Sequence, residues 1–486
     1  RMSESPEIWA TLNIGGEADW IEAVTKMDDS VSLLVCDSRL RLVSTDGRVL
    51  WSSTETGVLC FFGDLCGNRR DYVLLGNGPK LVLIDADTGQ TMWRHQFAPV
   101  YCQVRVAVGN VLSDQFGLEA AVFLAYGDEG ALIHFSPDGD PEILWQRTVG
   151  VPGEWPERYD HGCDIKLDLT KQDEPIIWNI RHHRCQGFDA RSGEMVSRLT
   201  YGIDGQQLRN YGVWNLGHDK DQQPILCVVS ENVQKHVHGI RLSREGENEL
   251  LWSHYYGELY VVPGVAVEHI ATTDVDKDGI TELIYNVLDP AHDYRAFVRI
   301  RCGATGVVKA SFEDAWCIGM GPEGCLLILD APDGMTPVLG RLTVYRLRPL
   351  NEPVALAVFE KSGIWGAPVS GREMRLRHIG PDGKVELGRY AIHLDGLEKI
   401  GCIENSCFLE SPVQIMVDAA ESMLLATDSR GTLNAYTCHG EHLWELPLNG
   451  GSSPTISAAD LNCNGHAQLV VAAAGNRMRT FAVRAA

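Results

Sequence analysis

The chain is built from short apolar runs that alternate with polar turns rich in Asp and Gly. The runs are about four to eight residues long, which is the length of a β-strand. Where two runs flank Asp-Gly or Thr-Gly, as in RLVSTDGRVLW and LIDADTGQTMW, they predict a β-hairpin. Glycine adopts the positive φ that such a tight turn needs. Because the apolar positions almost never follow a helical period, the pattern predicts an all-β protein.

One of these hairpins recurs along the chain and ends in tryptophan. The clear copies end at Trp51, Trp93, Trp145, Trp252 and Trp444. Weaker copies without the tryptophan begin at Gly187, Arg301 and Ile379. A second apolar hairpin precedes many copies, and the repeat length of roughly 42 to 58 residues is that of a four-stranded propeller blade. We therefore expect a single β-propeller domain over residues 1–486, made of four-stranded antiparallel blades.

The two ends of the sequence complement each other. The last repeat, Leu469 to Val483, stops before its tryptophan strand, whereas the N-terminal PEIWATL carries Trp9 without a preceding turn. Pairing the two would close the ring and hide both sheet edges. We favour eight blades, with seven as the alternative. The count depends on residues 365–395, which we interpret as an irregular insertion or as part of a neighbouring blade.

The repeated hairpin resembles the tryptophan repeat of quinoprotein-type propellers, and DVDKDGITE from Asp274 resembles the calcium loop of integrin-type FG-GAP repeats. The resemblance covers nearly the whole chain and implies an architecture, whereas function must be argued from a site. We expect the tryptophans to pack in the core or between blades. The adjacent cysteine pair associated with quinone-dependent dehydrogenases is missing, and we expect no organic cofactor.

The segment DVDKDGITE carries candidate metal ligands at Asp274, Asp276, Asp278 and Glu282. Alternate carboxylates followed by a glutamate can surround one hard cation, and Gly279 lets the loop turn sharply. The loop is shorter than an EF-hand loop. We expect a structural Ca²⁺ ion here, and the alternative is an acidic turn without an ion.

Composition narrows the choice of partners. The formal net charge of −23 opposes general nucleic-acid binding, which requires clustered Lys and Arg. No apolar run is long enough to cross a bilayer. We expect no nucleic-acid or membrane partner, a monomer, and a secreted or periplasmic location. The fourteen cysteines include no CxxC pair, so most are expected to be small buried residues, while disulfides Cys60–Cys66 and Cys402–Cys407 stay open.

The two ends of each predicted blade differ in chemistry. With strands named A to D along the chain, A–B and C–D turns lie at one end, and B–C turns and D–A connections lie at the other. The Asp-Gly hairpin turns and the Asp274 loop fall at the first end. In YDHGCDIKLDLTKQDEPIIWNIRHHRC, a turn centred near Gln172 implies an antiparallel register whose paired numbers sum to about 344. This register places His161 opposite His182 or His183 at the second end.

In the neighbouring repeats, further arginine, tyrosine and histidine residues are expected at that second end. They are Arg209, Tyr211, His236, His238, His254, Tyr255, Tyr256, His292, Tyr294 and Arg295, with Trp155 and Trp214 nearby for stacking on sugars. Seven of the sixteen histidines lie on these loops. Taken one at a time, each of these histidines could be an ordinary solvated or hydrogen-bonded loop residue. The cluster indicates a functional site, because loops at a propeller face commonly carry binding residues.

The cluster resembles that of propeller-fold polysaccharide lyases acting on ulvan and related rhamnose–uronate polymers, with rhamnogalacturonan lyases as the relatives for eight blades. Such lyases remove the proton beside a uronate carboxylate, which requires a base, an acid and a neutralising cation. The resemblance implies His161 with His182 or His183 as base or charge neutraliser, Tyr211 or Tyr255 as acid or base, and Arg209 or Arg295 on the carboxylate. It leaves substrate contacts to Tyr294, Trp155, Trp214, His236 and His238.

Three alternatives stay open. A glycoside hydrolase acting on the same linkage needs the same residue types. Zinc bound by Cys163, His183 and Cys185, with His236 or His238, fits the preference of that metal for thiolate and imidazole. A non-catalytic propeller could instead bind a protein or a sugar. An acidic polysaccharide partner also requires local positive charge, so we expect Arg158, Arg181, Arg184, Arg209 and Lys235 to gather around the groove.

Overall fold

The structure is a computed structural model, and it describes the following residues: 7–13, 18–98, 102–137, 140–150, 163–169, 171, 173–181, 184–200, 212–221, 223–230, 236–244, 246–257, 259–262, 274–289, 291–292, 295–320, 325–330, 340–347, 350, 352–364, 373–379, 385–393, 396–405, 409–416, 422–428, 432–437, 441–447, 455–459, 468–473 and 477–482. These residues form β-strands and connections, and no helix in them is long and apolar enough to cross a membrane. The all-β prediction is confirmed.

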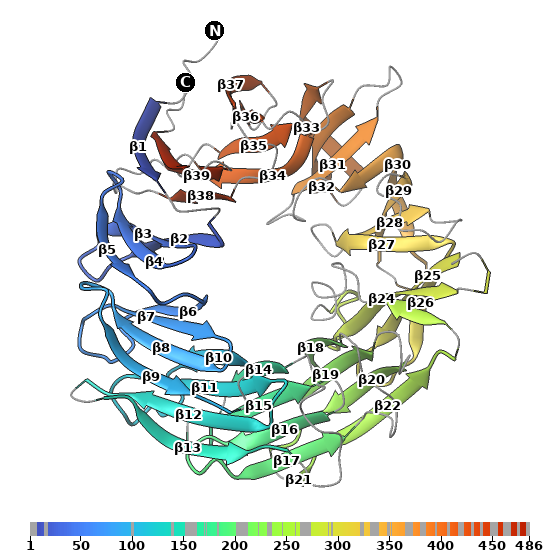
Figure 1. Cartoon of the computed structure of the whole chain (residues 1–486). Helices are drawn as coiled ribbons and strands as arrows, with labels where there is room; N and C mark the ends of the chain where they lie inside the picture. The colour runs from blue at the N-terminus through green and yellow to red at the C-terminus, as the bar shows by residue number, and fades with distance from the viewer. Residues whose placement is uncertain are drawn as a thin grey trace. The chain divides into compact units, whose positions relative to one another are not determined.

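The described strands assemble into nine sheets, most of them four-stranded antiparallel meanders whose strands follow the chain order (Figure 1). The chain divides into two compact units. Unit 1 is Arg1–Val122, Ala131–Leu144 and Gly401–Ala486, and unit 2 is Phe123–Gly130 and Trp145–Ile400. A four-stranded meander is the unit that a propeller repeats. The prediction is therefore confirmed for the blade, while ring closure and blade count stay predictions.

The first two sheets of unit 1 show how the hydrophobic pattern of each strand matches its place in the sheet. Their strands are β2 (Trp20–Thr25), β3 (Val31–Cys36), β4 (Leu40–Ser44) and β5 (Val49–Ser53), then β6 (Val58–Gly63), β7 (Tyr72–Asn77), β8 (Lys80–Asp85) and β9 (Thr91–Gln96). Middle strands such as β3 are buried almost throughout, whereas the last strand β9 alternates between half-buried and exposed positions. The middle strands therefore read as continuous apolar runs and the outer strands as alternating ones.

The remaining sheets of unit 1 include both chain ends. One contains β34 (Leu409–Met416), β35 (Ser422–Asp428), β36 (Thr432–Thr437) and β37 (His442–Pro447). The other contains β38 (Thr455–Ala459), β39 (Gln468–Ala473), β40 (Arg477–Ala482) and β1 (Glu7–Asn13). Strand β1 pairs antiparallel with β40, from Glu7 opposite Ala482 to Asn13 opposite Arg477. The N-terminal strand thus completes the last sheet, as the sequence predicted.

The sheets that carry the candidate residues follow next along the chain. The sheet before them is β10 (Gln103–Gly109), β11 (Leu118–Ala125), β12 (Glu129–Phe135) and β13 (Glu142–Thr148). Then come β14 (Cys163–Asp168), β15 (Ile176–Arg181), β16 (Arg184–Asp189) and β17 (Met195–Thr200), with β21 (Gly246–Glu247) added at the edge. The next sheets are β18 (Gly212–His218), β19 (Pro224–Ser230), β20 (His236–Arg241) and β22 (Glu249–Tyr255), and β23 (Tyr260–Val262), β24 (Glu282–Asp289), β25 (Arg295–Cys302) and β26 (Val308–Glu313).

A seven-stranded sheet replaces the regular pattern where the sequence repeat is weak. It comprises β27 (Ala315–Met320), β28 (Cys325–Asp330), β29 (Gly340–Arg346), β30 (Val354–Ile364), β31 (Glu373–Ile379), β32 (Val385–His393) and β33 (Gly396–Asn405). Strands β31 and β32 lie within 365–395 and continue the sheet from β30. This segment therefore extends a neighbouring sheet, which was one of the two interpretations of the sequence.

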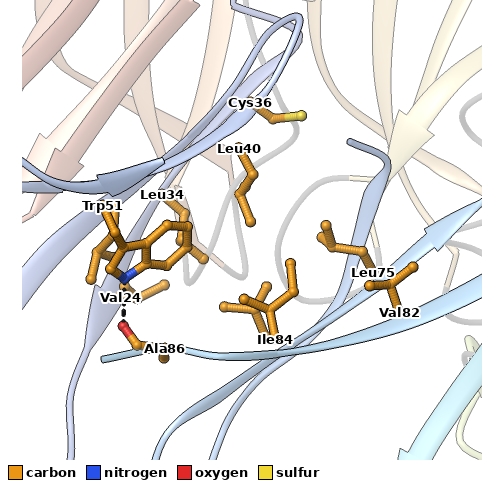
Figure 2. Packing of buried hydrophobic residues seen from close by; sticks show 11 residues of the cluster. Val24, Leu34, Cys36, Leu40, Trp51, Leu75, Val82, Ile84 and Ala86 are labelled. Carbon is orange, nitrogen blue, oxygen red and sulfur yellow. Dashed lines mark hydrogen bonds between the residues drawn. The ribbon is translucent and has the colours of Figure 1, made fainter. Parts of the chain in front are cut away.

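The recurring tryptophan joins successive sheets. Nε1 of Trp51 on β5 donates a 2.7 Å hydrogen bond to the carbonyl of Ala86, in the turn that follows β8 (Figure 2). Around it, apolar side chains of β2–β5 meet those of β7 and β8 in one buried cluster. Trp145 bonds to Ala190 at 2.8 Å and Trp252 to Gly303 at 2.7 Å in the same way. The prediction that tryptophans pack between blades is confirmed for these three.

The structure decides one of the two candidate disulfides. Cys60 and Cys66 are both free thiols, so the candidate disulfide between them is absent. The reason is that Cys60 lies against Gly76, whereas the Cys66 thiol is buried beside Tyr72. Cys407 lies outside the described residues. Six further cysteines are free and buried, as expected for small buried residues, namely Cys36, Cys102, Cys185, Cys302, Cys317 and Cys325.

Candidate functional site

The hairpin β14–β15 has the predicted register. Cys163 pairs with Arg181 and Asp168 with Ile176, and the two numbers of every pair sum to 344. The polar turn lies between Asp168 and Ile176, around the position predicted from TKQDEP. His161, His182 and His183 lie outside the described residues, next to the paired ends of these strands. That His161 faces His182 or His183 therefore stays a prediction.

The sheet topology sends other candidates to the predicted end of their sheets. His236 opens β20 and Arg295 opens β25, so both follow B–C turns. Tyr255 closes β22 and pairs with His236, and His238 pairs with Ser253 on the same strand. Arg209, Tyr211, Tyr294 and Trp155 lie outside the described residues, and the side chains of Trp214 and His236 are not described.

Exposure separates the candidates whose side chains are described. Tyr255 is 58% exposed and its phenol is accessible. His238 is only 3% exposed, because its ring lies in the interior of its blade, and this opposes direct contact with a polymer. The ring of His254 stacks edge-on against Tyr256, with centroids 4.5 Å apart. Of these three residues, Tyr255 therefore has the most exposed side chain.

Arg295 is exposed but already engaged. Its Nε donates to Oδ1 of Asp314 at 2.5 Å, and its Nη2 donates to Oδ2 of the same carboxylate at 3.2 Å. Oε2 of Glu313, the last residue of β26, lies 4.0 Å from Nη2 of Arg295. A bidentate arginine–carboxylate pair is among the stronger polar contacts. A substrate carboxylate would have to compete with Asp314 for this guanidinium.

Arg181 and Arg184 flank His182 and His183 in the sequence, and both are buried. Their exposed fractions are 0% and 1%. Nη2 of Arg181 donates to the carbonyl of Leu124 at 2.9 Å, and Nη2 of Arg184 donates to that of Val149 at 3.2 Å. The expectation that both arginines line the groove is wrong, because their guanidinium groups are buried and donate hydrogen bonds to backbone carbonyls inside the protein. They supply positive charge from within the protein.

Cys185 was expected to bind zinc together with Cys163 and His183. The Cys185 side chain is fully buried among apolar residues, and Nδ2 of Asn248 approaches its Sγ at 3.1 Å. Burial raises the pKa of this thiol to about 12. Zinc ligation requires the thiolate, so the surroundings of Cys185 oppose the zinc site. The side chains of Cys163 and His183 are not described.

The acidic loop between β23 and β24 forms the expected cluster. One oxygen from each of four carboxylates lies within 4.8 Å of the others, namely those of Asp274, Asp276, Asp278 and Glu282. Backbone amides of Asp278 and Gly279 donate to the carboxylate of Asp274 at 3.0 and 2.9 Å. Gly279 has a φ of +88°, a backbone conformation that would be strained for any residue with a side chain. The cluster could hold a metal ion.

Sequence reasoning missed Lys309 at this cluster. From β26, its Nζ lies 2.9 Å from Asp276, 2.6 Å from Asp278 and 2.7 Å from Glu282. Burial disfavours the ammonium, but the three ion pairs outweigh burial and raise the pKa of Lys309 above its ordinary value. Burial raises the pKa of Glu282 to about 7, although Lys309 and the amide of Val275 lower it. No spacing in the sequence indicates this lysine.

A second buried carboxylate was also missed. Glu119 is 0% exposed, and its Oε2 accepts hydrogen bonds from the amides of Val111 and Leu112 at 2.8 and 2.9 Å. Its Oε1 lies 2.7 Å from Nδ1 of His134 on β12. Like Glu282, it fixes the connection between the first and second strands of its sheet. This indicates a structural role.

No protein-family model matches this chain, and no curated protein matches it in sequence. Among solved structures, BamB from Moraxella catarrhalis is 12% identical over 75% of this chain and 94% of its own, with a TM-score of 0.32. The Dos1 propeller is 9% identical over 98% and 95%, with a TM-score of 0.41. A quinohemoprotein alcohol dehydrogenase from Pseudomonas putida HK5 is 12% identical over 98% and 76%, with a TM-score of 0.38. These likenesses assign neither a family nor a function.

Proposed function

We propose that this protein is a polysaccharide lyase that cleaves a uronate-containing polymer, of the rhamnose–uronate type, by β-elimination. The observation that carries the proposal is the register of β14 and β15. Extended two residues beyond the Cys163–Arg181 pair, this register would bring His161 to the same end of the hairpin as His182 and His183, which join β15 to β16. Strand β14 pairs directly with β15, so His161 and one imidazole of that turn can act on one sugar.

The chemistry divides among the predicted groups. One imidazole withdraws the proton beside the uronate carboxylate, and the other neutralises the charge that develops there. The exposed phenol of Tyr255, across from His236 on the neighbouring strand, supplies a proton to the leaving sugar oxygen. Both steps lie at the same end of their sheets, the end of B–C turns and D–A connections.

Local charge supports an anionic substrate despite the net charge of −23. The buried guanidinium groups of Arg181 and Arg184 lie on both sides of the His182–His183 turn. A buried charge is poorly screened, and it raises the potential at the nearby surface without touching the ligand. These two arginines therefore favour a carboxylate at the turn. We assign them a positioning role.

Substitution of the histidine pair tests the proposal. His161→Ala and His183→Ala should each lower the rate of unsaturated-uronate formation by about a hundredfold or more, the usual contribution of a general acid or base. Their melting temperatures should stay near that of the wild type. His442→Ala is the matched control, because His442 is exposed at the start of β37 and follows a C–D turn, so it belongs to the other end of its sheet. A His161→Ala variant that folds and keeps full activity would contradict the catalytic role of His161.

We propose separately that the acidic loop binds Ca²⁺ and has a structural role. Four carboxylates within reach of one ion and a glycine at the sharp turn support this choice, since Ca²⁺ takes oxygen ligands in flexible arrangements. Calcium titration followed by calorimetry tests it. The site is supported if the wild type binds one calcium ion and the Asp278→Asn variant binds it more weakly. Equal binding heats for the wild type and the variant would contradict the site.

A further inference from the structure

The acidic loop already holds a positive charge from another strand. Lys309 belongs to β26, the last strand of the sheet whose second strand begins at Glu282. Its ammonium contacts three of the four carboxylates of the cluster at 2.6 to 2.9 Å. We propose that Lys309 is a tethered cation that occupies the loop in place of a divalent ion and must leave before such an ion can bind. The proposal rests on the calcium-binding role proposed for the loop and is independent of the lyase.

Geometry makes the two occupants mutually exclusive. Ca²⁺ needs its ligand oxygens at about 2.3 to 2.6 Å. Lys309 contacts Oδ2 of Asp276, Oδ2 of Asp278 and Oε1 of Glu282, whereas backbone amides bond to the other oxygen of each carboxylate. An ion would therefore compete with the ammonium for the same three oxygens. An ion in their midst would lie against the ammonium, and two cations in contact repel strongly where the surroundings are buried. Lys309 is only 17% exposed and Glu282 is 0% exposed.

The lysine also explains how the loop keeps its form without an ion. Backbone amides satisfy Asp274 and one oxygen of Glu282, whereas Lys309 contacts the other oxygen of Glu282 together with Asp276 and Asp278. Carboxylates brought this close repel one another unless a cation lies between them. Strand β26 pairs with β25 from Val308 to Glu313, with a bulge at Lys309, and so holds the lysine beside the loop.

A variant without the ammonium tests the exclusion. Lys309→Met keeps the apolar stem and removes the charge, and Lys220→Met is the matched control. Lys220 lies beside the same loop, with Cγ 3.9 Å from where a Cβ at Gly279 would be, and its charge acts on Asp278. Calorimetric titration with CaCl₂ should give Lys309→Met at least about tenfold tighter binding than wild type, because the vacated state is then fully populated. The Lys220→Met variant should gain much less.

Two results of this titration overturn the proposal: equal affinities of wild type and Lys309→Met, or an absence of binding in both. Binding by Lys309→Met alone supports the tethered cation and contradicts a resident calcium ion in the native protein. The two proposals can thus fail separately.

A measurement on the wild-type protein covers the case in which Lys309→Met does not fold. Lysines are acetylated briefly with an amine-reactive ester, with and without CaCl₂, and Lys309 and Lys220 are quantified by mass spectrometry. Lys309 should be protected without calcium and become reactive with it, while Lys220 changes little. Bound calcium with Lys309 still protected would overturn the exclusion.

Discussion

Nε1 of Trp51 donates to the carbonyl of Ala86 across the boundary between two sheets, at 2.7 Å. Ala86 precedes the Asp-Thr-Gly turn of the second sheet, and the indole ring lies over Gly89 of that turn. Gly89 therefore has two functions, since it permits the positive φ and leaves room for the preceding tryptophan. Trp145 with Gly193 and Trp252 with Gly306 repeat the arrangement.

Trp51→Phe should lower the free energy of unfolding by about 1 kcal/mol or more, because it removes the hydrogen bond to Ala86 and part of the buried ring. Urea unfolding measures the change. Leu50→Ala on the same strand is the control, since Leu50 is 43% exposed and should cost much less. Equal effects of the two substitutions would contradict the anchoring role.

Gly89→Ala should destabilise the protein more than Gly246→Ala. Both glycines have positive φ, +73° and +83°, so both alanines carry backbone strain of about 1 to 2 kcal/mol. A Cβ at Gly89 would also lie 2.6 Å from the Trp51 ring, whereas nothing lies within 4 Å of one at Gly246. Thermal unfolding of both variants isolates the contact with Trp51. A larger loss for Gly246→Ala would refute it.

Glu119→Ala should cost about 3 kcal/mol, because the amides of Val111 and Leu112 would be left buried without an acceptor. Chemical unfolding measures the loss, with Glu142→Ala as the control at an exposed position of the same sheet. Amide hydrogen exchange at Val111 and Leu112 should accelerate in the variant. Unchanged exchange would show that Glu119 does not hold this connection.

Burial raises the pKa values of the Cys185 and Cys317 thiols to about 12, so at neutral pH both should be protonated and unreactive. Brief alkylation of the native protein with iodoacetamide should spare them, and alkylation after unfolding should modify both. Mass spectrometry of the peptides distinguishes the cases. Rapid native labelling of Cys185 would indicate a thiolate and reopen the zinc interpretation.

Local patterns carried the predictions that succeeded. The polar turn of TKQDEP limits how β14 and β15 can pair, because a slip of one residue would turn every apolar side chain to the wrong face. The register was therefore correct. The positions of the Asp-Gly turns likewise follow from the conformation of glycine, and the tryptophan strands follow from the repeat.

The failures concern contacts between residues distant in sequence. Lys309 lies 27 residues from Glu282, and no periodicity links a strand residue to a loop in another part of its sheet. Arg181 was expected at the surface, as charged residues usually are, but the carbonyl of Leu124, 57 residues away, accepts its hydrogen bond inside. The irregular segment around β31 and β32 carries only the weak hairpin copy that begins at Ile379, without the tryptophan.

The most direct test of the proposed function is the ultraviolet absorbance of unsaturated uronate during incubation with ulvan, rhamnogalacturonan and the side chains of gum arabic. Only β-elimination forms this double bond. We predict rising absorbance with at least one rhamnose–uronate polymer, and its loss in His161→Ala. Flat absorbance with all of them would contradict the lyase, in favour of hydrolysis if new reducing ends form and of a binding scaffold if none do.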